Sequence, residues 1–245
     1  MNTSKAKVTT VAVIQARMSS TRLPGKSTML VAGRPLLAHV VERVRRAGSI
    51  DRVVVATSED PLDDDIARVS AELDVACFRG SLEDVLDRYC RAAKPHEPDY
   101  VVRVTGDCPL ADPDVIDLIV RHCIDGGHDY ASNNVARSFP HGLDVEAFRF
   151  SCLEEANRET RSDFDREHVT PYIKANPERY DISYVRSEQD RSHYRWTVDW
   201  PVDLEHIRSI FDALYPSNPC FTTDDVISYL EANSAVMALN AVHNE

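Results

Sequence analysis

The chain has 245 residues, of which 43% are hydrophobic and 28% charged, a composition typical of a soluble globular protein. Acidic residues outnumber basic ones by 40 to 28, so the formal net charge is -12. Because nucleic-acid binders need a basic surface, this balance argues against nucleic acid as a partner. An anionic small molecule is not excluded, since a local cluster of cations acts at contact range.

Six cysteines are scattered along the chain without a Cys-x-x-Cys pair. This spacing favours reduced thiols over a disulfide framework or a zinc site. Met1–Lys7 is polar and has no apolar core, which predicts no signal peptide, and no apolar run is long enough to span a bilayer. We therefore expect a cytoplasmic protein that has no membrane partner.

The apolar run Val8–Ile14 predicts a buried strand. The loop after it, residues 15–26, combines small and hydroxyl side chains with Arg17, Arg22 and Lys26. Backbone N–H groups and cations beyond the carboxyl end of a strand can bind and neutralise a triphosphate. The sequence therefore predicts a phosphate-binding loop, although such a loop taken alone could also be a solvated turn.

The same loop ends in Gly25-Lys26-Ser27, as the P-loop pattern G-x-x-x-x-G-K-[ST] does. That pattern requires a glycine where this chain has Ser20, and Pro24 removes a backbone donor from the loop. A P-loop ATPase is therefore disfavoured.

Strand and helix patterns alternate over the first half of the chain. The predicted strands are Arg52–Thr57 and Tyr100–Thr105, and the predicted helices are Leu36–Ala47 with Pro35 at its first position, Asp60 to Leu73, one after a capping box at Ser81–Asp84, and Asp112 to Gly126. This alternation predicts an α/β fold, a mixed, mainly parallel sheet with helices on both faces.

The pattern changes near residue 130, and residues 130–190 are expected to form a small antiparallel extension or lobe. The elements predicted from there on are strands at Leu143–Phe150, Asp181–Arg186 and Arg195–Val198, and helices within Ser151–Asn176 and at Val202–Leu214 and Thr223–Asn233. Because no linker or repeat interrupts the chain, we predict a single domain over residues 1–245.

Two aspartates directly follow predicted strands. Asp107 lies in Thr105-Gly106-Asp107-Cys108-Pro109, and Asp199 lies in Thr197-Val198-Asp199-Trp200-Pro201. Ligands of open parallel sheets bind beyond the carboxyl ends of the strands, so both aspartates should face the phosphate-binding loop. Two carboxylates beside a triphosphate suit Mg²⁺, which takes few carboxylates together with phosphate oxygens and water. Either aspartate taken alone could be only a turn or cap residue.

Several longer segments resemble a known family. In chain order they are IQARMSSTRLPGK, GRPLL, FRGSLEDVLDRY, RVTGDCPLADP, SFPHGLDVEAF, REHVTPYI and TVDWPVDLE, which run from residue 14 to about residue 205. They are similar to the cytidylyltransferases that activate sugars, including the CMP-KDO and acylneuraminate synthetases, and within them to the branch named for the spore-coat polysaccharide biosynthesis protein SpsF.

The resemblance implies the nucleotide-diphospho-sugar transferase (Rossmann-like) fold, CTP as co-substrate, Mg²⁺ as metal and a homodimer whose contacts and acceptor side involve residues 130–190. By motif match, the nucleotide-binding positions are Ala16, Arg17, Arg22, Lys26, Gly80, Ser81 and Asp84. The metal positions are Asp107 and Asp199, and Arg17, Lys26 and Asp107 would be catalytic. The sugar-side positions are Arg137, His141, Asp144 and Glu146, with Arg166, Glu167 and His168 as weaker candidates.

Some residues depart from the family pattern or allow a second interpretation. CMP-KDO synthetases carry Gln where this chain has Thr105, and a small residue where it has Trp200, which leaves the acceptor open. Asp144 and Glu146 are two apart on a predicted strand and should face the same side, either towards an acceptor or towards solvent. His168 could be a general base or could pack against a helix.

We therefore predict a nucleotidyltransferase in which an oxygen of an acidic or modified sugar attacks the α-phosphorus of CTP and expels pyrophosphate, for surface or spore polysaccharide synthesis. A GT-A glycosyltransferase is one alternative, but it needs a strand-terminal Asp-x-Asp, which neither Asp112-Pro113-Asp114 nor Asp163-Phe164-Asp165 provides. A non-catalytic nucleotide-binding module is the other. Retention of both candidate metal aspartates argues against it.

Overall fold

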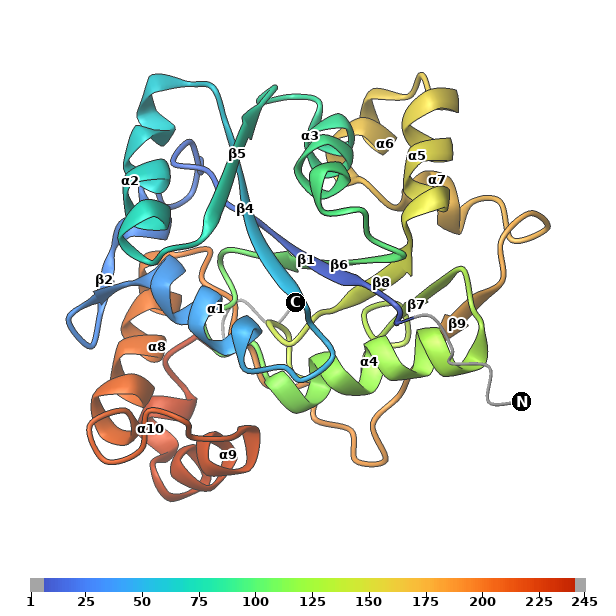
Figure 1. Cartoon of the computed structure of the whole chain (residues 1–245). Helices are drawn as coiled ribbons and strands as arrows, with labels where there is room; N and C mark the ends of the chain where they lie inside the picture. The colour runs from blue at the N-terminus through green and yellow to red at the C-terminus, as the bar shows by residue number, and fades with distance from the viewer. Residues whose placement is uncertain (1–6, 241–245) are drawn as a thin grey trace.

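The computed structural model describes residues 7–240, over which a seven-stranded sheet is covered by helices on both faces (Figure 1). The strand order is β5-β4-β1-β6-β8-β7-β9. The strands are β1 (Thr10–Gln15), β4 (Arg52–Ser58), β5 (Ala76–Gly80), β6 (Tyr100–Thr105), β7 (Tyr130–Ser132), β8 (Glu146–Arg149) and β9 (Ile182–Tyr184). Only β8 runs antiparallel to its neighbours among these described strands, so the predicted mixed, mainly parallel sheet is confirmed. The absence of a signal peptide stays a prediction, because residues 1–6 lie outside the described residues.

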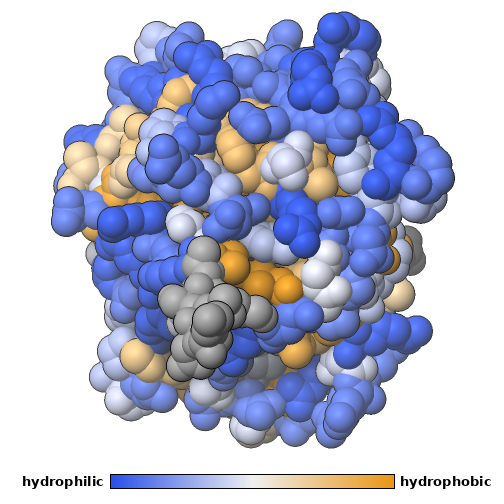
Figure 2. Space-filling view, turned by 45° about the vertical axis from the view of Figure 1, so that its right-hand side comes forward, coloured by the Kyte–Doolittle hydropathy of each residue, from blue (hydrophilic) through white to orange (hydrophobic). Residues whose placement is uncertain are grey.

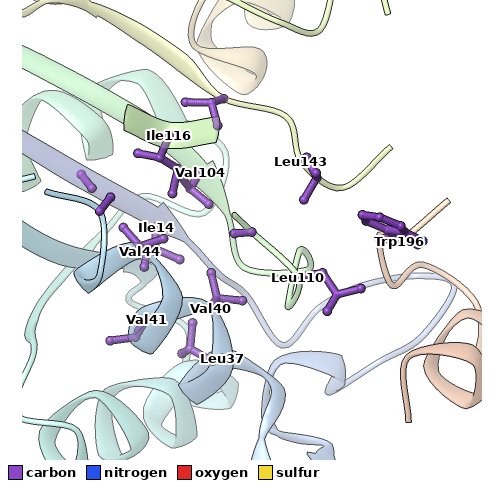
Figure 3. Packing of buried hydrophobic residues seen from close by; sticks show 14 of the residues in the cluster. Ile14, Leu37, Val40, Val41, Val44, Val104, Leu110, Ile116, Leu143 and Trp196 are labelled. Atoms are coloured by element: carbon purple, nitrogen blue, oxygen red, sulfur yellow. The ribbon is translucent and has the colours of Figure 1, made fainter. Parts of the chain in front are cut away.

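The central strands are apolar on both sides, because helices cover both faces of a parallel sheet. One face packs against α1 (Leu36–Arg45), α2 (Asp64–Glu72) and α4 (Pro113–Gly126), and the C-terminal helices α8 (Pro201–Leu214) and α9 (Thr223–Ala232) join this cluster. Figure 3 shows Val40 and Val44 of α1 beside Ile14 of β1, and the same cluster continues through Leu143 and Trp196. The other face packs against α3 (Val85–Ala93), α5 (Phe150–Glu159) and α7 (Pro171–Lys174) (Figure 1).

Local sequence patterns locate several elements well. The predicted strand at Tyr100–Thr105 is β6, and α4 begins after Asp112, whose carboxylate accepts hydrogen bonds from the N–H groups of Asp114 and Val115. Two starts differ from the prediction. Pro35 lies in a short hairpin, β2 (Leu30–Val31) with β3 (Arg34–Pro35), and precedes α1 rather than opening it.

The third helix, α3, also begins differently, because Asp84 itself is the N-cap. Its carboxylate accepts from the N–H of Asp87, whereas the sequence predicted a capping box that starts at Ser81. The Ser81 hydroxyl instead accepts from the N–H of Asp84 and orders the preceding turn.

The predicted strand at Arg195–Val198 is wrong. Its apolar side chains are buried as expected, with Trp196 and Val198 at most 1% exposed, but the segment does not join the sheet. The reason is that β1 and β8 already flank β6. The segment instead makes an isolated bridge to His141, and the N–H of Val198 donates to the carbonyl of Asp107 over 2.9 Å.

Residues 130–190 add to the main sheet through β7, β8 and β9, and their helices α5, α6 (Asp163–His168) and α7 lie on the α3 side (Figure 1). That the full chain forms one domain stays a prediction.

None of the described helices has the length and apolarity needed to cross a membrane. The face of the molecule in Figure 2 is mostly hydrophilic, with apolar residues in small patches.

Candidate active site

The ends of β1 and β6 bring the predicted phosphate-binding loop beside Asp107. Gln15 and Thr105 are register partners, and the N–H of Gly106 donates to the carbonyl of Gln15 over 2.7 Å. A Cβ on Gly106 would lie 2.9 Å from that carbonyl oxygen and 3.0 Å from the Cβ of Ala16. Only glycine therefore lets β6 end this close to the start of the loop.

Asp63, which lies within the helix predicted from Asp60 to Leu73, holds the backbone of this loop. Its carboxylate accepts from the N–H of Met18 over 2.7 Å and from the N–H of Ser58 over 3.0 Å, and the side chain is buried. Gly25 closes the loop in the left-handed region, with φ 76°, and its N–H donates to the carbonyl of Met18. The backbone of the loop is thus ordered by protein contacts.

A cavity of about 220 Å³ lies over this loop. Six of the residues predicted to bind nucleotide or metal line it, namely Ala16, Arg17, Arg22, Lys26, Asp107 and Asp199. Arg103 of β6 lines the same cavity and was missed by the sequence analysis. The available indication was a charged residue inside an otherwise apolar buried strand.

Lys26 lines the cavity and contacts both candidate metal aspartates. Its Nζ donates to Asp107 Oδ2 over 2.9 Å, to Asp199 Oδ1 over 3.1 Å and to the carbonyl of Val198 over 2.7 Å. Burial opposes the charge of Lys26, but the two carboxylates outweigh it and raise the pKa of the ammonium group. Burial likewise opposes the charge of Asp107, and Lys26 reverses this effect and lowers the pKa of that carboxyl group.

Asp199 has cations on both of its oxygens. Arg22 Nη2 lies 2.9 Å from Oδ1, and Arg195 Nη2 lies 2.9 Å from Oδ2. The Arg22 guanidinium also stands over the ring of Trp200, 5.3 Å from its centroid. Arg195 was predicted only as part of a core strand, so its contact with Asp199 is a finding of the structure.

Arg195 also defines the protonation of His141. Its Nη1 lies 3.0 Å from His141 Nδ1, and because a guanidinium only donates, Nδ1 must be the acceptor. The ring proton is therefore on Nε2, which lies 3.9 Å from Asp144 Oδ2. Burial lowers the pKa of His141, so the ring is neutral at pH 7 and offers a hydrogen-bond donor on Nε2 rather than a base.

The four predicted sugar-side residues separate into two groups. Arg137 Nη1 pairs with Asp144 Oδ1 over 2.9 Å, next to His141. Glu146 is apart from them, because Asp144 precedes β8 and the strand alternation that was expected to align the two carboxylates does not extend to it.

Glu146 is buried and fully engaged. It is the cross-strand partner of Arg103, whose Nη1 lies 2.5 Å from Glu146 Oε2. Its other oxygen accepts from Tyr130, Thr170 and Lys174. Burial opposes its charge, but Arg103 and Lys174 lower the pKa of Glu146 to about 2. This carboxylate therefore holds Arg103 in place at the cavity. Contact between Glu146 and an acceptor stays a prediction.

A second cavity, of about 750 Å³, adjoins the first and shares Arg17 and Thr21 with it. Ser81, Asp84, Arg166 and Glu167, all named by sequence, line it. Arg166 Nη1 pairs with Asp84 Oδ2 over 2.6 Å. Gly80, at the buried end of β5, and His168, whose ring packs on Phe164 with centroids 4.4 Å apart, do not line either cavity.

The donor set around Lys26 fits Mg²⁺. Two carboxylate oxygens and one backbone carbonyl converge on a single cation, and hard oxygens are the ligands that Mg²⁺ prefers. Between residues 7 and 240 no group of three or more His, Cys, Asp and Glu side chains could hold a metal. A metal at this position would therefore need ligands from a bound phosphate and water as well.

Comparison with known proteins identifies the family. The family model described as cytidylyltransferase matches residues 11–231. The chain belongs to the cytidylyltransferase family. Spore coat polysaccharide biosynthesis protein SpsF of Bacillus subtilis is 32% identical over 228 residues, which cover 90% of this chain and 93% of that protein. A 3-deoxy-manno-octulosonate cytidylyltransferase of an Anaeromyxobacter species is 39% identical over 126 residues, about half of each chain (49% and 48%).

The fold agrees with this assignment. The solved structure of a cytidylyltransferase from Leptospira borgpetersenii superposes with a TM-score of 0.89 at 34% identity and covers 94% of this chain and 97% of that one. The predicted family and fold are therefore confirmed, and the protein is a CTP-dependent nucleotidyltransferase. Neither of the two Asp-x-Asp segments considered for a glycosyltransferase ends a strand, because Asp112 caps α4 and accepts from Thr223, and Asp163 lies in α6.

Proposed function

We propose that this cytidylyltransferase transfers the cytidylyl group of CTP to a hydroxyl of an acidic or modified sugar, with Mg²⁺ bound by Asp107 and Asp199 and pyrophosphate released. The observation that carries the proposal is the convergence of Lys26, Asp107 and Asp199 on one point of a cavity that is also lined by three arginines. Cations and a pair of carboxylates together are what a metal-bound triphosphate requires.

The roles of the residues follow from their positions. Arg17, Arg22 and Lys26 would neutralise the phosphates as the acceptor oxygen attacks the α-phosphorus and the bond to the β-phosphate oxygen breaks. Bound Mg²⁺ would supply further neutralisation of the phosphate oxygens, held by Asp107 and Asp199. Most of the rate would come from this positioning and charge neutralisation.

The two cavities suggest where the rest of each substrate lies. The larger cavity continues from Arg17 and Thr21 to Ser81 and Asp84, and we place the nucleoside there. The acceptor would then approach from the side of Arg137, His141 and Asp144. His141 would donate a hydrogen bond through Nε2 to an acceptor oxygen, because its Nδ1 is engaged by Arg195.

The acceptor class is supported by the relatives. One of them acts on 3-deoxy-manno-octulosonate, an acidic sugar, and SpsF is named for spore coat polysaccharide synthesis. A product used in surface polysaccharide synthesis, a homodimer and a cytoplasmic location belong to the same proposal, on the family resemblance.

The proposal is tested by calorimetric titration of CTP, UTP, ATP and GTP with Mg²⁺ into the native protein, Asp107→Ala and the control Asp212→Ala. Asp212 is exposed on α8, so its replacement makes the same change of charge away from the cavity. We expect selective binding of CTP, loss of its Mg²⁺ dependence in Asp107→Ala only, and then pyrophosphate release in a screen of acidic sugars.

Preference for UTP would contradict the base assignment and reopen the glycosyltransferase interpretation. Failure to bind any triphosphate would refute the proposed site. Saturable CTP binding without turnover on any acceptor would favour the non-catalytic module.

A further inference from the structure

The Lys26 ammonium group occupies the point where the two candidate metal carboxylates meet. All three of its protons are used, by Asp107, by Asp199 and by the carbonyl of Val198, at distances between 2.7 and 3.1 Å. The Lys26 side chain is 11% exposed, so water screens these contacts little. A protein cation therefore neutralises these carboxylates in the nucleotide-free chain.

A metal ion cannot bind both carboxylates while Lys26 stays there. Mg²⁺ needs its oxygen ligands at about 2.0–2.1 Å, which would place it almost on the Nζ position. Two cations so close together in a buried site repel each other strongly. Binding of Mg²⁺ by Asp107 and Asp199 together therefore requires the ammonium group to leave.

The surroundings allow Lys26 to leave without loss of the Asp199 geometry. Arg195 still pairs with Asp199 Oδ2, and Asp203, which Arg195 also contacts, still accepts from the N–H of Asp199. Lysine carries a compact charge on a flexible four-carbon chain, and a triphosphate in the same cavity would offer it new anionic partners.

We propose that Lys26 is an exchangeable cation that makes metal binding depend on nucleotide binding. Without nucleotide it neutralises Asp107 and Asp199 and keeps Mg²⁺ out. When the triphosphate binds, Lys26 moves to phosphate oxygens and the two carboxylates become free for the metal. Mg²⁺ then enters with the nucleotide or after it, not before. The inference rests on the proposed function, because it takes a triphosphate as the partner that draws Lys26 away.

The test measures metal binding in the absence of nucleotide. Mg²⁺ is titrated by calorimetry, and Mn²⁺ by the electron paramagnetic resonance of the free ion, into the native protein, Lys26→Met and Lys26→Gln. Lys94→Met is the matched control, because Lys94 pairs with Glu154 at the exposed surface and its loss changes the net charge equally. Circular dichroism and thermal unfolding of each variant establish that it is folded.

We expect both Lys26 variants to bind Mg²⁺ and Mn²⁺ at least about tenfold more tightly than the native protein and Lys94→Met, since a competing cation is gone. Mg²⁺ should also raise the unfolding temperature of the Lys26 variants more than that of the other two proteins. The gain should disappear in Lys26→Met combined with Asp107→Asn.

Equal metal affinities in all four proteins would overturn the inference. So would a gain that survives Asp107→Asn, since the metal would then bind elsewhere. Titration of CTP with Mg²⁺ into the native protein separates the two proposals. If the native protein binds CTP and Mg²⁺ together but the Lys26 variants show no gain, only the exchange is wrong. If it binds no CTP, the proposed function fails, whatever the metal affinities are.

Discussion

Arg195 positions Asp199 from four residues earlier in the chain, with Nη2 2.9 Å from Asp199 Oδ2. The same guanidinium contacts both oxygens of Asp203, which in turn accepts from the N–H groups of Asp199 and Trp200. The backbone and the side chain of Asp199 are therefore both held by buried groups before any ligand binds. Such preorganisation is what a metal-binding or catalytic carboxylate needs.

Arg195→Met should destabilise the protein by about 3–5 kcal/mol, because it leaves the fully buried carboxylate of Asp203 without its cation. Urea unfolding measures the loss. The control is Arg68→Met, which removes a surface arginine paired with Asp65 and Glu72 and should cost no more than ~1 kcal/mol. Similar losses in the two variants would show that the Arg195 network does not stabilise the fold.

Glu146→Gln should cost about 3–5 kcal/mol at neutral pH, because the change breaks the ion pair with Arg103 in a largely buried position and leaves that cation without its partner. Folding lowers the pKa of Glu146 from 4.5 to about 2, so its ionised form stabilises the protein above pH 4.5. The difference between the native protein and the variant should therefore shrink as pH falls from 4.5 towards 2. Urea unfolding over a pH series checks this, with the surface change Glu154→Gln as control. A difference that does not vary with pH would contradict the assigned pKa.

Gly142→Ala should be more destabilising than Gly33→Ala. Both glycines have positive φ, 112° and 75°, and at Gly33 a Cβ would meet no atom within 4 Å, which leaves a strain of about 1–2 kcal/mol. At Gly142 a Cβ would lie 2.7 Å from the backbone of Trp196 and Thr197. This change should also weaken CTP binding, since that segment leads to Asp199. Thermal unfolding and CTP calorimetry measure both effects, and equal results for the two variants would contradict this packing.

Arg17→Met should weaken CTP binding by roughly 10- to 100-fold, as expected for a lost charge-assisted contact of about 1.5–3 kcal/mol. Arg17 lines both cavities, and among the described residues no carboxylate lies at ion-pair distance from it. Arg22→Met should have a smaller effect, because Arg22 is half exposed and already paired with Asp199. Calorimetry at low and high salt compares them. A greater loss in Arg22→Met would mean that the phosphates lie nearer Asp199 than we propose.

Much of this architecture could be predicted because its causes are local in sequence. β6 is a short apolar run with defined ends, α4 starts at an Asp-Pro pair and is capped at its C-terminus by Gly127, and the loop before Lys26 follows directly from β1. Arg195–Val198 shows the limit of such reasoning. Its apolar pattern predicted burial correctly, but burial alone does not determine which strands pair. In the structure β6 pairs with β1 and β8, and not with this segment.

The sequence by itself determined the alternation of strands and helices, the cationic loop beyond β1 and the two aspartates that follow apolar segments, because each depends on residues that are neighbours in the chain. Only the tertiary structure decided that Lys26 bridges Asp107 and Asp199, that Arg195 holds Asp199 and His141, and that Glu146 forms an ion pair with Arg103. Most of these contacts join residues more than forty positions apart, and the Arg195–Asp199 pair lies in a segment that does not join the sheet. They depend on which side chains share a low-dielectric space once the sheet is assembled, and no local pattern contains that information.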